Sequence, residues 1–593
     1  MPRFDDTSGA DPAAGGLPAA GGDWSSTVIN RRGFLRAGVL LAGAGLAAGP
    51  LPAAFASSRT RVAPVAPAAA VPPNILVIVV DQMRAPCWFV AGGSPDGLPP
   101  NLARLRHGAV SFARHYTASN DCTPARAALV TGLHTHQTGC MITGKSTLDP
   151  RFPTWGTMLR EQGYATSWYG KWHLTQGDDG WTAGEGSAAL ERYGFGGGTY
   201  PSPNGAPGQG AEVDPRIANQ FAQWFREAGG AGPWCTTVSF VNPHDIAWWY
   251  RYSDPGLLAA SVSSGTPLPP NFETPAQLRA RRKPLLQRSL QATAAQSFGA
   301  VPFSGPDLQA RWAPFLDLYS ALQRAVDVQI GAVLDALASQ PQIAANTVVV
   351  FTADHGEYGA SHGLRGKGAS VYEEAIRVPL LVSDPRARLT AAPERVRRQL
   401  TSSVDVAPLL LTIACGSGEW RTDPRYADLA ARPDLAAILA DPAAPGRSVA
   451  LHATDEVVTE FALEPYVAHA PHHIVGAITA NAKYATYTHW RPGTLHPLAR
   501  GEQTELYDYS THAGRLEIAN LAGRHPLESQ LRTTLEQAAR DELHAPLGPA
   551  LQDAQRAGIS NYLRLSAAEA HAAHALRLRG ANTIVGGSSG VPT

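Results

Sequence analysis

The chain has 593 residues, of which 44% are hydrophobic and 17% are charged, and 49 Lys and Arg balance 49 Asp and Glu. This length is ample for a large buried core, and a net charge of zero excludes a global field that would steer the protein to nucleic acid or to an anionic membrane. The five cysteines, at positions 87, 122, 140, 235 and 415, form no CxxC or short zinc-binding spacing. The composition therefore predicts a globular protein whose fold does not depend on disulfide bonds.

The N-terminal region has the features of an export signal. The sequence INRRGFLR at residues 29–36 precedes a weakly apolar stretch over residues 37–48, which is similar to a twin-arginine signal. The apolar run is about half of the roughly 20 residues that a membrane-spanning helix needs, so no stable membrane anchor is expected. We expect a signal peptide at 1–56 for the Tat translocase, a linker at 57–73, and export to the periplasm or the medium. Because this route carries folded proteins, cofactors and modifications would be installed before export.

Four apolar, β-branched or aromatic runs each end in chemically capable side chains. They cover residues 74–80, 164–169, 236–241 and 346–353, and the sequences DQ, GKWH, NPHD and DHGE follow them in that order. Continuous apolar runs are typical of strands buried on both faces. Helical patterns lie between them, the clearest at residues 316–337.

This alternation predicts an α/β fold with a doubly wound, mostly parallel sheet flanked by helices, in a catalytic domain at 74–420. Ligands of such sheets bind beyond the carboxyl ends of the strands, so we expect the four polar clusters to converge there.

The amino-acid composition changes after residue 420. Loops rich in Ala, Pro and Asp lead to strand-like segments at 482–487 and 504–508 and then to helical sequence. We expect a smaller C-terminal α+β subdomain at 421–579. The Gly- and Ser-rich tail at 580–593 is predicted to be disordered.

The sequence SNDCTPARAALVTG at residues 119–132 places a cysteine at the start of a helix. Pro124 suits a first helical turn, and Gly132 is a natural C-terminal stop. Backbone N–H groups at a helix N-terminus stabilise anions, including a thiolate. The local pattern is compatible with two roles for Cys122, a nucleophile or a small buried residue that begins the helix.

The pattern CTPAR at residues 122–126, followed by TG at 131–132, resembles the signature of the type I sulfatases of the alkaline-phosphatase superfamily. In that family a formylglycine-generating enzyme oxidises the cysteine to Cα-formylglycine, whose hydrated aldehyde is the nucleophile. One hydroxyl attacks sulfur, and the second expels sulfate once it is deprotonated. The resemblance implies that the chain hydrolyses small-molecule sulfate monoesters, that Cys122 is converted to formylglycine, and that the generating enzyme is a transient partner.

The resemblance covers roughly residues 73 to 415 and also implies one divalent metal ion. Its ligands would be Asp81, Gln82, the modified Cys122, Asp354 and His355. Such an ion lowers the pKa of the attacking hydroxyl and polarises a sulfate oxygen. Many sulfatases carry Asp-Asp and Asp-Asn in the two pairs where this chain has Asp-Gln and Asp-His. One negative charge is lost and an imidazole is gained, which shifts preference from calcium toward manganese or a similar ion.

Five further residues receive catalytic roles from the same resemblance. Arg126 would hold the diol and a metal carboxylate, Lys171 would contact sulfate and diol, and His173 would be the base for the second hydroxyl. His244 would lie near the leaving-group oxygen. Lys367 would neutralise sulfate and protonate the leaving group.

Alternatives to a sulfatase remain open on the sequence. The Asp-Gln and Asp-His pairs also resemble those of the formylglycine-dependent phosphonate monoester and phosphodiester hydrolases. GKWHL at residues 170–174, by contrast, resembles the motif of arylsulfatase-like members. A non-catalytic protein that binds a sulfated ligand is the third interpretation. The natural substrate, the metal and the oligomeric state are not determined by these residues, and no nucleic-acid partner is expected.

Overall fold

The computed structural model of the chain describes residues 71–85, 98–175, 188–252, 256, 266–457, 466–467 and 469–585, with side chains up to residue 568. All of them lie in one compact unit, Ala70–Thr593. The predicted signal peptide at 1–56 and Cys87 lie outside the described residues. No helix in the described part of the chain is both long and apolar enough to cross a membrane. Its four cysteines, at positions 122, 140, 235 and 415, are free thiols.

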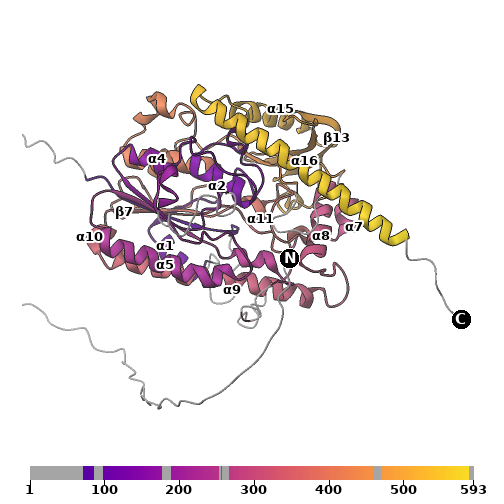
Figure 1. Cartoon of the computed structure of the whole chain (residues 1–593), viewed down its shortest axis with the longest axis horizontal. Helices are drawn as coiled ribbons and strands as arrows, with labels where there is room; N and C mark the ends of the chain where they lie inside the picture. The colour runs from indigo at the N-terminus through magenta and orange to yellow at the C-terminus, as the bar shows by residue number, and fades with distance from the viewer. Residues whose placement is uncertain are drawn as a thin grey trace, which may run out of the picture. The chain divides into compact units, whose positions relative to one another are not determined.

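A seven-stranded sheet with the order β2-β8-β7-β1-β6-β4-β5 forms the centre of the fold (Figure 1). Six of the seven strands run in one direction, and β8 is antiparallel to its neighbours β7 and β2. The four predicted strands are present with their ends shifted by at most two residues, which confirms the mostly parallel α/β fold. The strand bounds are β1 (Asn74–Val80), β2 (Ala109–Ser111), β4 (Ala165–Gly170), β5 (Gly196–Gly197), β6 (Trp234–Phe240), β7 (Thr347–Ala353) and β8 (Leu380–Ser383).

The continuous apolar sequence of β1 is explained by burial on both faces. Alternate residues point to opposite sides of a strand, and Ile75, Val77 and Val79 belong to one core cluster while Leu76, Ile78 and Val80 belong to another. Figure 1 shows α2 and α4 on one face and α5 and α9 on the other. The predicted helix at 316–337 is the inner part of α9. The covering helices are α1 (Pro100–Arg106), α2 (Cys122–Thr131), α4 (Trp155–Arg160), α5 (Gln209–Ala228), α9 (Leu308–Ala338) and α12 (Val406–Cys415).

A second, antiparallel sheet follows in the C-terminal part, with the order β10-β11-β12-β13. One of its faces packs against α15, and the other shares a core cluster with Tyr358, Tyr372 and Ile376, which follow β7. The strand-like segments predicted at 482–487 and 504–508 lie inside β12 and β13. The final helix α16 runs to Val585, past Gly580 where the tail was predicted to begin. The bounds are β10 (Ala450–Thr454), β11 (His473–Ile478), β12 (Ala482–Trp490), β13 (Pro497–Asp508), α15 (Glu528–Ala538) and α16 (Pro549–Val585).

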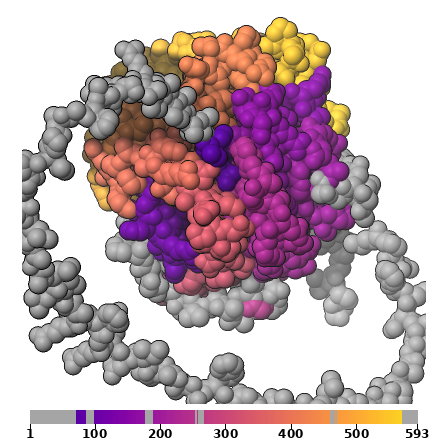
Figure 2. Space-filling model, turned by 90° about the vertical axis from the view of Figure 1, so that its left-hand side faces the viewer, coloured from indigo at the N-terminus to yellow at the C-terminus, as the bar shows by residue number. Residues whose placement is uncertain are grey.

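Segments far apart in the sequence meet at the surface. In Figure 2, orange segments that follow α12 adjoin purple segments around α4. There the Tyr426 hydroxyl donates to Glu161 Oε2 at 2.6 Å, and Arg425 pairs with the same carboxylate at 3.0 Å. The shorter elements lie in the connections: β3 (His115–Tyr116), β9 (Thr401–Ser402), α3 (Thr135–Thr138), α7 (Pro275–Ala280), α8 (Leu285–Phe298), α10 (Pro341–Ala344), α11 (Glu373–Ile376), α13 (Leu435–Ala440) and α14 (His512–Arg515).

Gly170 allows β4 to approach β6 closely at the end that carries Lys171. Its φ is 97°, and a Cβ there would lie 1.9 Å from the carbonyl oxygen of Ser239. Gly163 also has a positive φ, 82°, but a Cβ added there would meet nothing within 4 Å.

We expect Gly163→Ala to lower the free energy of unfolding by about 1 kcal/mol, the cost of the left-handed backbone. Gly170→Ala should lower it by about 3 kcal/mol because the strands must also separate. Urea denaturation measures both, and equal losses would contradict the close-approach argument.

Candidate active site

The predicted site residues lie at the carboxyl ends of neighbouring strands. Asp81 and Gln82 follow β1, and Asp354 and His355 follow β7. The parallel register pairs Val80 at the end of β1 with both Ala353 of β7 and Phe240 of β6, so the polar residues that follow these strands come together. Lys171 and His173 follow β4, His244 follows β6, Lys367 lies in the loop after β7, and Cys122 and Arg126 lie on α2.

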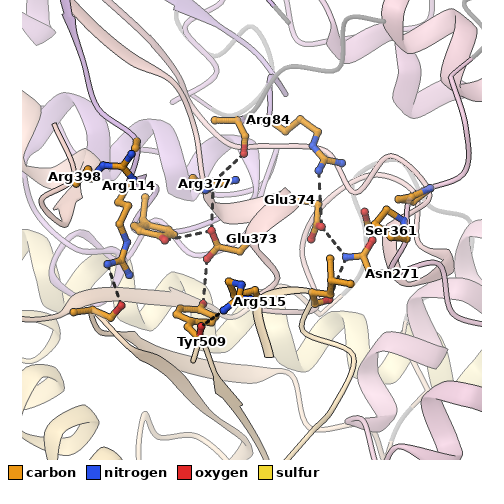
Figure 3. Close-up of a pocket in the computed structure, with 17 residues that line it drawn as sticks. Arg84, Arg114, Asn271, Ser361, Glu373, Glu374, Arg377, Arg398, Tyr509 and Arg515 are labelled. Atoms are coloured by element: carbon orange, nitrogen blue, oxygen red, sulfur yellow. Dashed lines mark hydrogen bonds and ion pairs between the residues drawn. The ribbon is translucent and has the colours of Figure 1, made fainter. Parts of the chain in front are cut away.

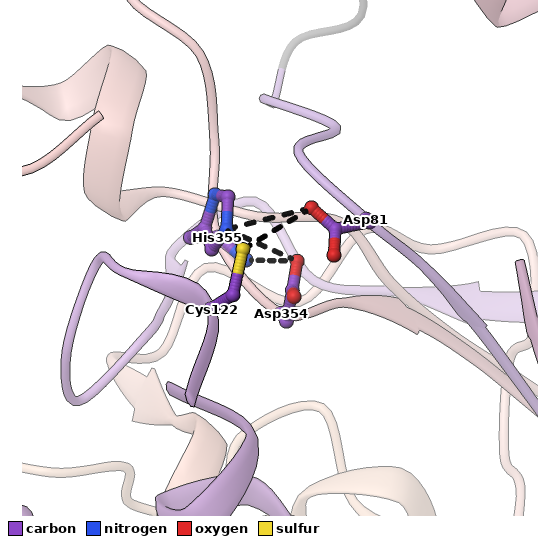
Figure 4. A group of neighbouring side chains, drawn as sticks. All are labelled: Asp81, Cys122, Asp354 and His355. Atoms are coloured by element: carbon purple, nitrogen blue, oxygen red, sulfur yellow. Dashed lines mark hydrogen bonds and ion pairs between the residues drawn. The ribbon is translucent and has the colours of Figure 1, made fainter. Parts of the chain in front are cut away.

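Asp81, Cys122, Asp354 and His355 form a fully buried cluster whose candidate ligand atoms all lie within 4.8 Å of one another (Figure 4). Cys122 Sγ lies 3.2 Å from His355 Nε2 and 3.7 Å from Asp81 Oδ1. His355 Nε2 lies 3.7 Å from Asp354 Oδ1. Two carboxylates, an imidazole and a residue at a helix start therefore face one point.

His355 presents a lone pair to this cluster. Its Nδ1 lies 3.1 Å from the carbonyl oxygen of Gly356, and a proton on Nδ1 that donates to this oxygen leaves Nε2 as the acceptor. Burial lowers the pKa of His355, against the opposing effect of Asp354 and Asp81, so the neutral ring is favoured. A neutral imidazole together with carboxylate oxygens is a donor set that fits a divalent ion such as manganese.

Arg126 holds the two carboxylates in place. Its Nη2 lies 2.9 Å from Asp81 Oδ2, and its Nε lies 2.9 Å from Asp354 Oδ2. Lys171 Nζ adds a second cation 2.8 Å from Asp81 Oδ2. Burial opposes the ionisation of Asp81, but Lys171, His244, Arg126 and His355 together hold the pKa of its carboxyl well below the usual range. Asp81 is therefore kept as an anion inside the protein, as metal ligation requires.

Cations also surround the Cys122 side chain. Lys367 Nζ lies 3.1 Å from Cys122 Sγ, and Lys171 Nζ lies 3.8 Å from it. Cys122 is the first residue of α2, so the positive end of that helix acts in the same direction. A group transferred to this position as an oxyanion would meet several positive charges in a buried setting, where their effect is large.

Two of the predicted catalytic residues, His173 and His244, follow strands β4 and β6. His173 has a positive φ of 57°, and its carbonyl oxygen accepts a 3.0 Å hydrogen bond from Thr123, the neighbour of Cys122. His244 is fully buried. A Cβ at Gly205 would lie 2.8 Å from His244 Nδ1 and 3.0 Å from Lys171 Nζ, so the side chains of His244 and Lys171 border the same space.

Glu357 is a buried residue to which the sequence analysis gave no role. Its Oε2 accepts a 2.5 Å hydrogen bond from Gln82 Nε2, which turns the amide so that Gln82 Oε1 lies 3.0 Å from Lys367 Nζ. Its Oε1 accepts from the backbone N–H groups of Gly359 and Gly366 at 3.0 and 2.8 Å. Glu357 thus closes the loop that carries Lys367. The available signal was the acidic residue of the DHGE sequence at 354–357.

The fold and this site together define a hydrolase of the alkaline-phosphatase-like class. A family model described as Sulfatase matches residues 73–417, and the chain belongs to the sulfatase family. It is therefore a sulfuric ester hydrolase, a class to which relatives of the chain such as the arylsulfatases and a steryl-sulfatase also belong.

The chain is similar to individual sulfatases in sequence and to a related hydrolase in fold. The chain is 28% identical over 372 residues to the uncharacterised sulfatase YidJ of Escherichia coli, covering 58% of this chain and 68% of that protein. It is 28% identical over 378 residues to the choline-sulfatase of Rhizobium meliloti, covering 58% and 67%. The solved phosphonate monoester hydrolase of Silicibacter pomeroyi shares the fold, with a TM-score of 0.60 and 21% identity over 80% of this chain and 95% of that one.

Removal of Arg126 should destabilise the whole molecule. Arg126→Met leaves two buried carboxylates without their shared partner, so we expect the free energy of unfolding to fall by about 3–5 kcal/mol. Arg104 supplies a matched control, because its 2.6 Å ion pair with Asp335 is solvent-exposed. Arg104→Met should cost less than about 1 kcal/mol. Urea denaturation of both variants makes the comparison, and similar losses would contradict the central role of Arg126.

Proposed function

We propose that this sulfuric ester hydrolase cleaves sulfate monoesters with a Cα-formylglycine derived from Cys122 as the nucleophile, assisted by one divalent metal ion. The observation that carries the proposal is the position of Cys122. Cys122 is the first residue of α2. Its Sγ lies within 3.2 Å of both His355 Nε2 and Lys367 Nζ, in a fully buried cluster. The hydrated aldehyde would supply one hydroxyl to attack sulfur and a second to expel sulfate.

The metal ligands in this proposal are Asp81, Gln82, residue 122, Asp354 and His355. The donor set is rich in oxygen but includes an imidazole, which suits manganese as well as calcium. A bound divalent ion would lower the pKa of a coordinated hydroxyl and polarise a sulfate oxygen. Arg126 fixes the distance between the two carboxylates by bonding to both.

The remaining polar residues would handle charge and protons. Lys367 and Lys171 would balance the sulfate charge, and Lys367, whose Nζ lies closer to residue 122, would protonate the leaving-group oxygen. His244 would lie beside that oxygen. His173 would accept the proton of the second hydroxyl, which is the step that releases sulfate.

We further propose that the chain matures in the cytoplasm and is then exported. The sequence at residues 29–36 is similar to a twin-arginine signal, and that route carries folded proteins. A formylglycine-generating enzyme would therefore act on Cys122 before the Tat translocase exports the protein to the periplasm or the medium.

A phosphonate monoester or phosphodiester hydrolase is the second candidate function. Gln82 and His355 favour it, because they replace the acid and the amide that many sulfatases carry at these positions. A steady-state comparison of an aryl sulfate with an aryl phosphonate monoester and a phosphodiester separates the two. We expect kcat/KM for the sulfate to be at least about 100-fold higher, a difference of about 2.7 kcal/mol in transition-state stabilisation. A higher value for either phosphorus ester would favour the second candidate, and no turnover of any ester would favour a non-catalytic binder.

Cys122 itself gives the sharpest test of the mechanism. Protein co-expressed with a formylglycine-generating enzyme should show an aldehyde in place of the thiol at residue 122 by mass spectrometry, while Cys415, which is also a free thiol, stays unmodified. Cys122→Ser should accept the sulfuryl group but complete at most one turnover, because serine has no second hydroxyl to expel sulfate. A sulfated serine peptide is the expected product. Multiple turnovers of the serine variant at the wild-type rate would disprove the diol mechanism.

A further inference from the structure

A cleft of about 550 Å³ lies apart from the proposed catalytic and metal-binding residues, none of which line it (Figure 3). Its walls come from loops of the central fold, such as that of Arg84, and from the loops that follow β11 and β13. Two glutamates and five arginines line it: Glu373, Glu374, Arg84, Arg114, Arg377, Arg398 and Arg515. The lining is therefore rich in guanidinium groups, in a chain whose net charge is zero.

Glu373 is already neutralised by cations of the protein. Lys483 Nζ lies 2.9 Å from Glu373 Oε1, and Arg377 Nε lies 3.3 Å from Glu373 Oε2. Burial opposes its ionisation, but Lys483 and Arg377, with a weaker contribution from Arg114, hold the pKa of Glu373 below its ordinary value. This carboxylate is thus an ionised partner of Lys483 and Arg377, and Arg114 acts on it only weakly.

Glu374, the second glutamate of the lining, also contacts cations and a donor of the protein. It lies 3.8 Å from both Arg84 Nη2 and His362 Nε2, and it accepts a 2.8 Å hydrogen bond from Asn271 Nδ2. Burial opposes its ionisation, yet His362, Arg84 and Asn271 keep the pKa of Glu374 below its ordinary value. Both carboxylates of the lining thus face cations or donors of the protein at or behind the cleft wall.

Three arginines remain without an acidic partner at ion-pair distance among the described residues. Arg114 donates to the carbonyl oxygens of Thr479 and Ala480 at 2.6 and 3.1 Å. Arg515 donates to those of Tyr509 and Ser510 at 2.8 and 3.1 Å. Arg398 is exposed and makes no hydrogen bond or ion pair within the part of the chain that the structure describes.

These three side chains are suited to bind oxyanions. A guanidinium has five N–H donors in a rigid plane, and those of Arg114 and Arg515 that bond to carbonyl oxygens leave further donors on the same group. Like charges in a recessed site repel one another and focus a positive potential, which an anion relieves. Sulfate, phosphate and carboxylate groups match this donor geometry in pairs of hydrogen bonds.

The other walls of the cleft indicate that the ligand has an organic body. Tyr116, Tyr509, Pro269, Pro270 and Leu516 contribute aromatic and apolar surface between the arginines. Such surfaces bind aromatic rings and hydrocarbon groups by desolvation and stacking. An inorganic ion alone would leave this apolar surface exposed to water. The volume falls in the range of sites that bind small organic ligands, about 300–1,000 Å³.

We propose that this cleft is a second binding site, separate from the catalytic centre, for a small organic polyanion that carries at least two sulfate, phosphate or carboxylate groups. Arg398 and Arg515 would bind its anionic groups at the mouth, and Arg114 would bind deeper in the cleft. This proposal does not depend on the nature of the nucleophile at residue 122.

Isothermal titration calorimetry with naphthalene-1,5-disulfonate tests the proposal, because a sulfonate has no ester bond for the catalytic centre to cleave. Naphthalene-1-sulfonate is the monovalent control. We expect one disulfonate per chain to bind at least about 10-fold more tightly than the monosulfonate at low salt, with an affinity that falls as salt is added. Equal affinities of the two probes would overturn the proposal.

Variants then locate the bound probe. The double variant Arg398→Ser, Arg515→Ser should weaken disulfonate binding at least about 10-fold, while Arg500→Ser, an exposed arginine of β13, should leave it unchanged. Lys367→Met, in the catalytic centre, should also leave it unchanged. Thermal denaturation verifies that each variant is folded. Binding that survives the double arginine variant, or that is lost with Lys367→Met, would place the probe elsewhere and overturn the proposal.

Discussion

The bridge that Arg126 makes between Asp81 and Asp354 is the interaction on which the site depends. Its guanidinium forms ion pairs with both carboxylates at 2.9 Å, and its Nη1 donates to the Lys171 carbonyl and to Ser239 Oγ at 2.8 and 3.0 Å. One buried cation thus joins the ends of β1, β4, β6 and β7. A guanidinium suits this position because its planar, always charged donors reach several acceptors, which a lysine ammonium cannot match.

The same bridge explains the spacing of the CTPAR sequence. Residues four apart on a helix project from the same face, so when Arg126 is anchored to the strand ends, Cys122 faces them too. Pro124 occupies the first turn of α2, where its missing N–H has no partner to lose, and Gly132 ends the helix with a φ of 72°. The position of Cys122 therefore follows from the helix and from the buried ion pairs of Arg126.

The sequence was sufficient for those parts of the site whose geometry is local or set by strand register. Buried runs that end in DQ, GKWH, NPHD and DHGE predicted which side chains meet, and the parallel pairing of β1 with β6 and β7 brings them together. The role of Glu357 was not predictable, because its hydrogen bond to Gln82 spans 275 positions in the chain. The arginine cleft was not predictable either, because β3 and β9 bring Arg114 close to Arg398 across almost 300 positions, and Arg515 joins them from the C-terminal part of the chain.

The structure gives Lys171 and Lys367 different surroundings. Lys171 Nζ lies 2.8 Å from Asp81 Oδ2 and 3.8 Å from Cys122 Sγ, so its charge interacts more strongly with the Asp81 carboxylate than with residue 122. Lys367 Nζ lies 3.1 Å from Cys122 Sγ and 3.0 Å from the neutral Gln82 Oε1. Coulomb energy falls with distance, so charge that develops at residue 122 is felt more strongly at Lys367. Lys171 therefore stabilises the Asp81 carboxylate, and Lys367, positioned by the loop that Glu357 closes, faces residue 122.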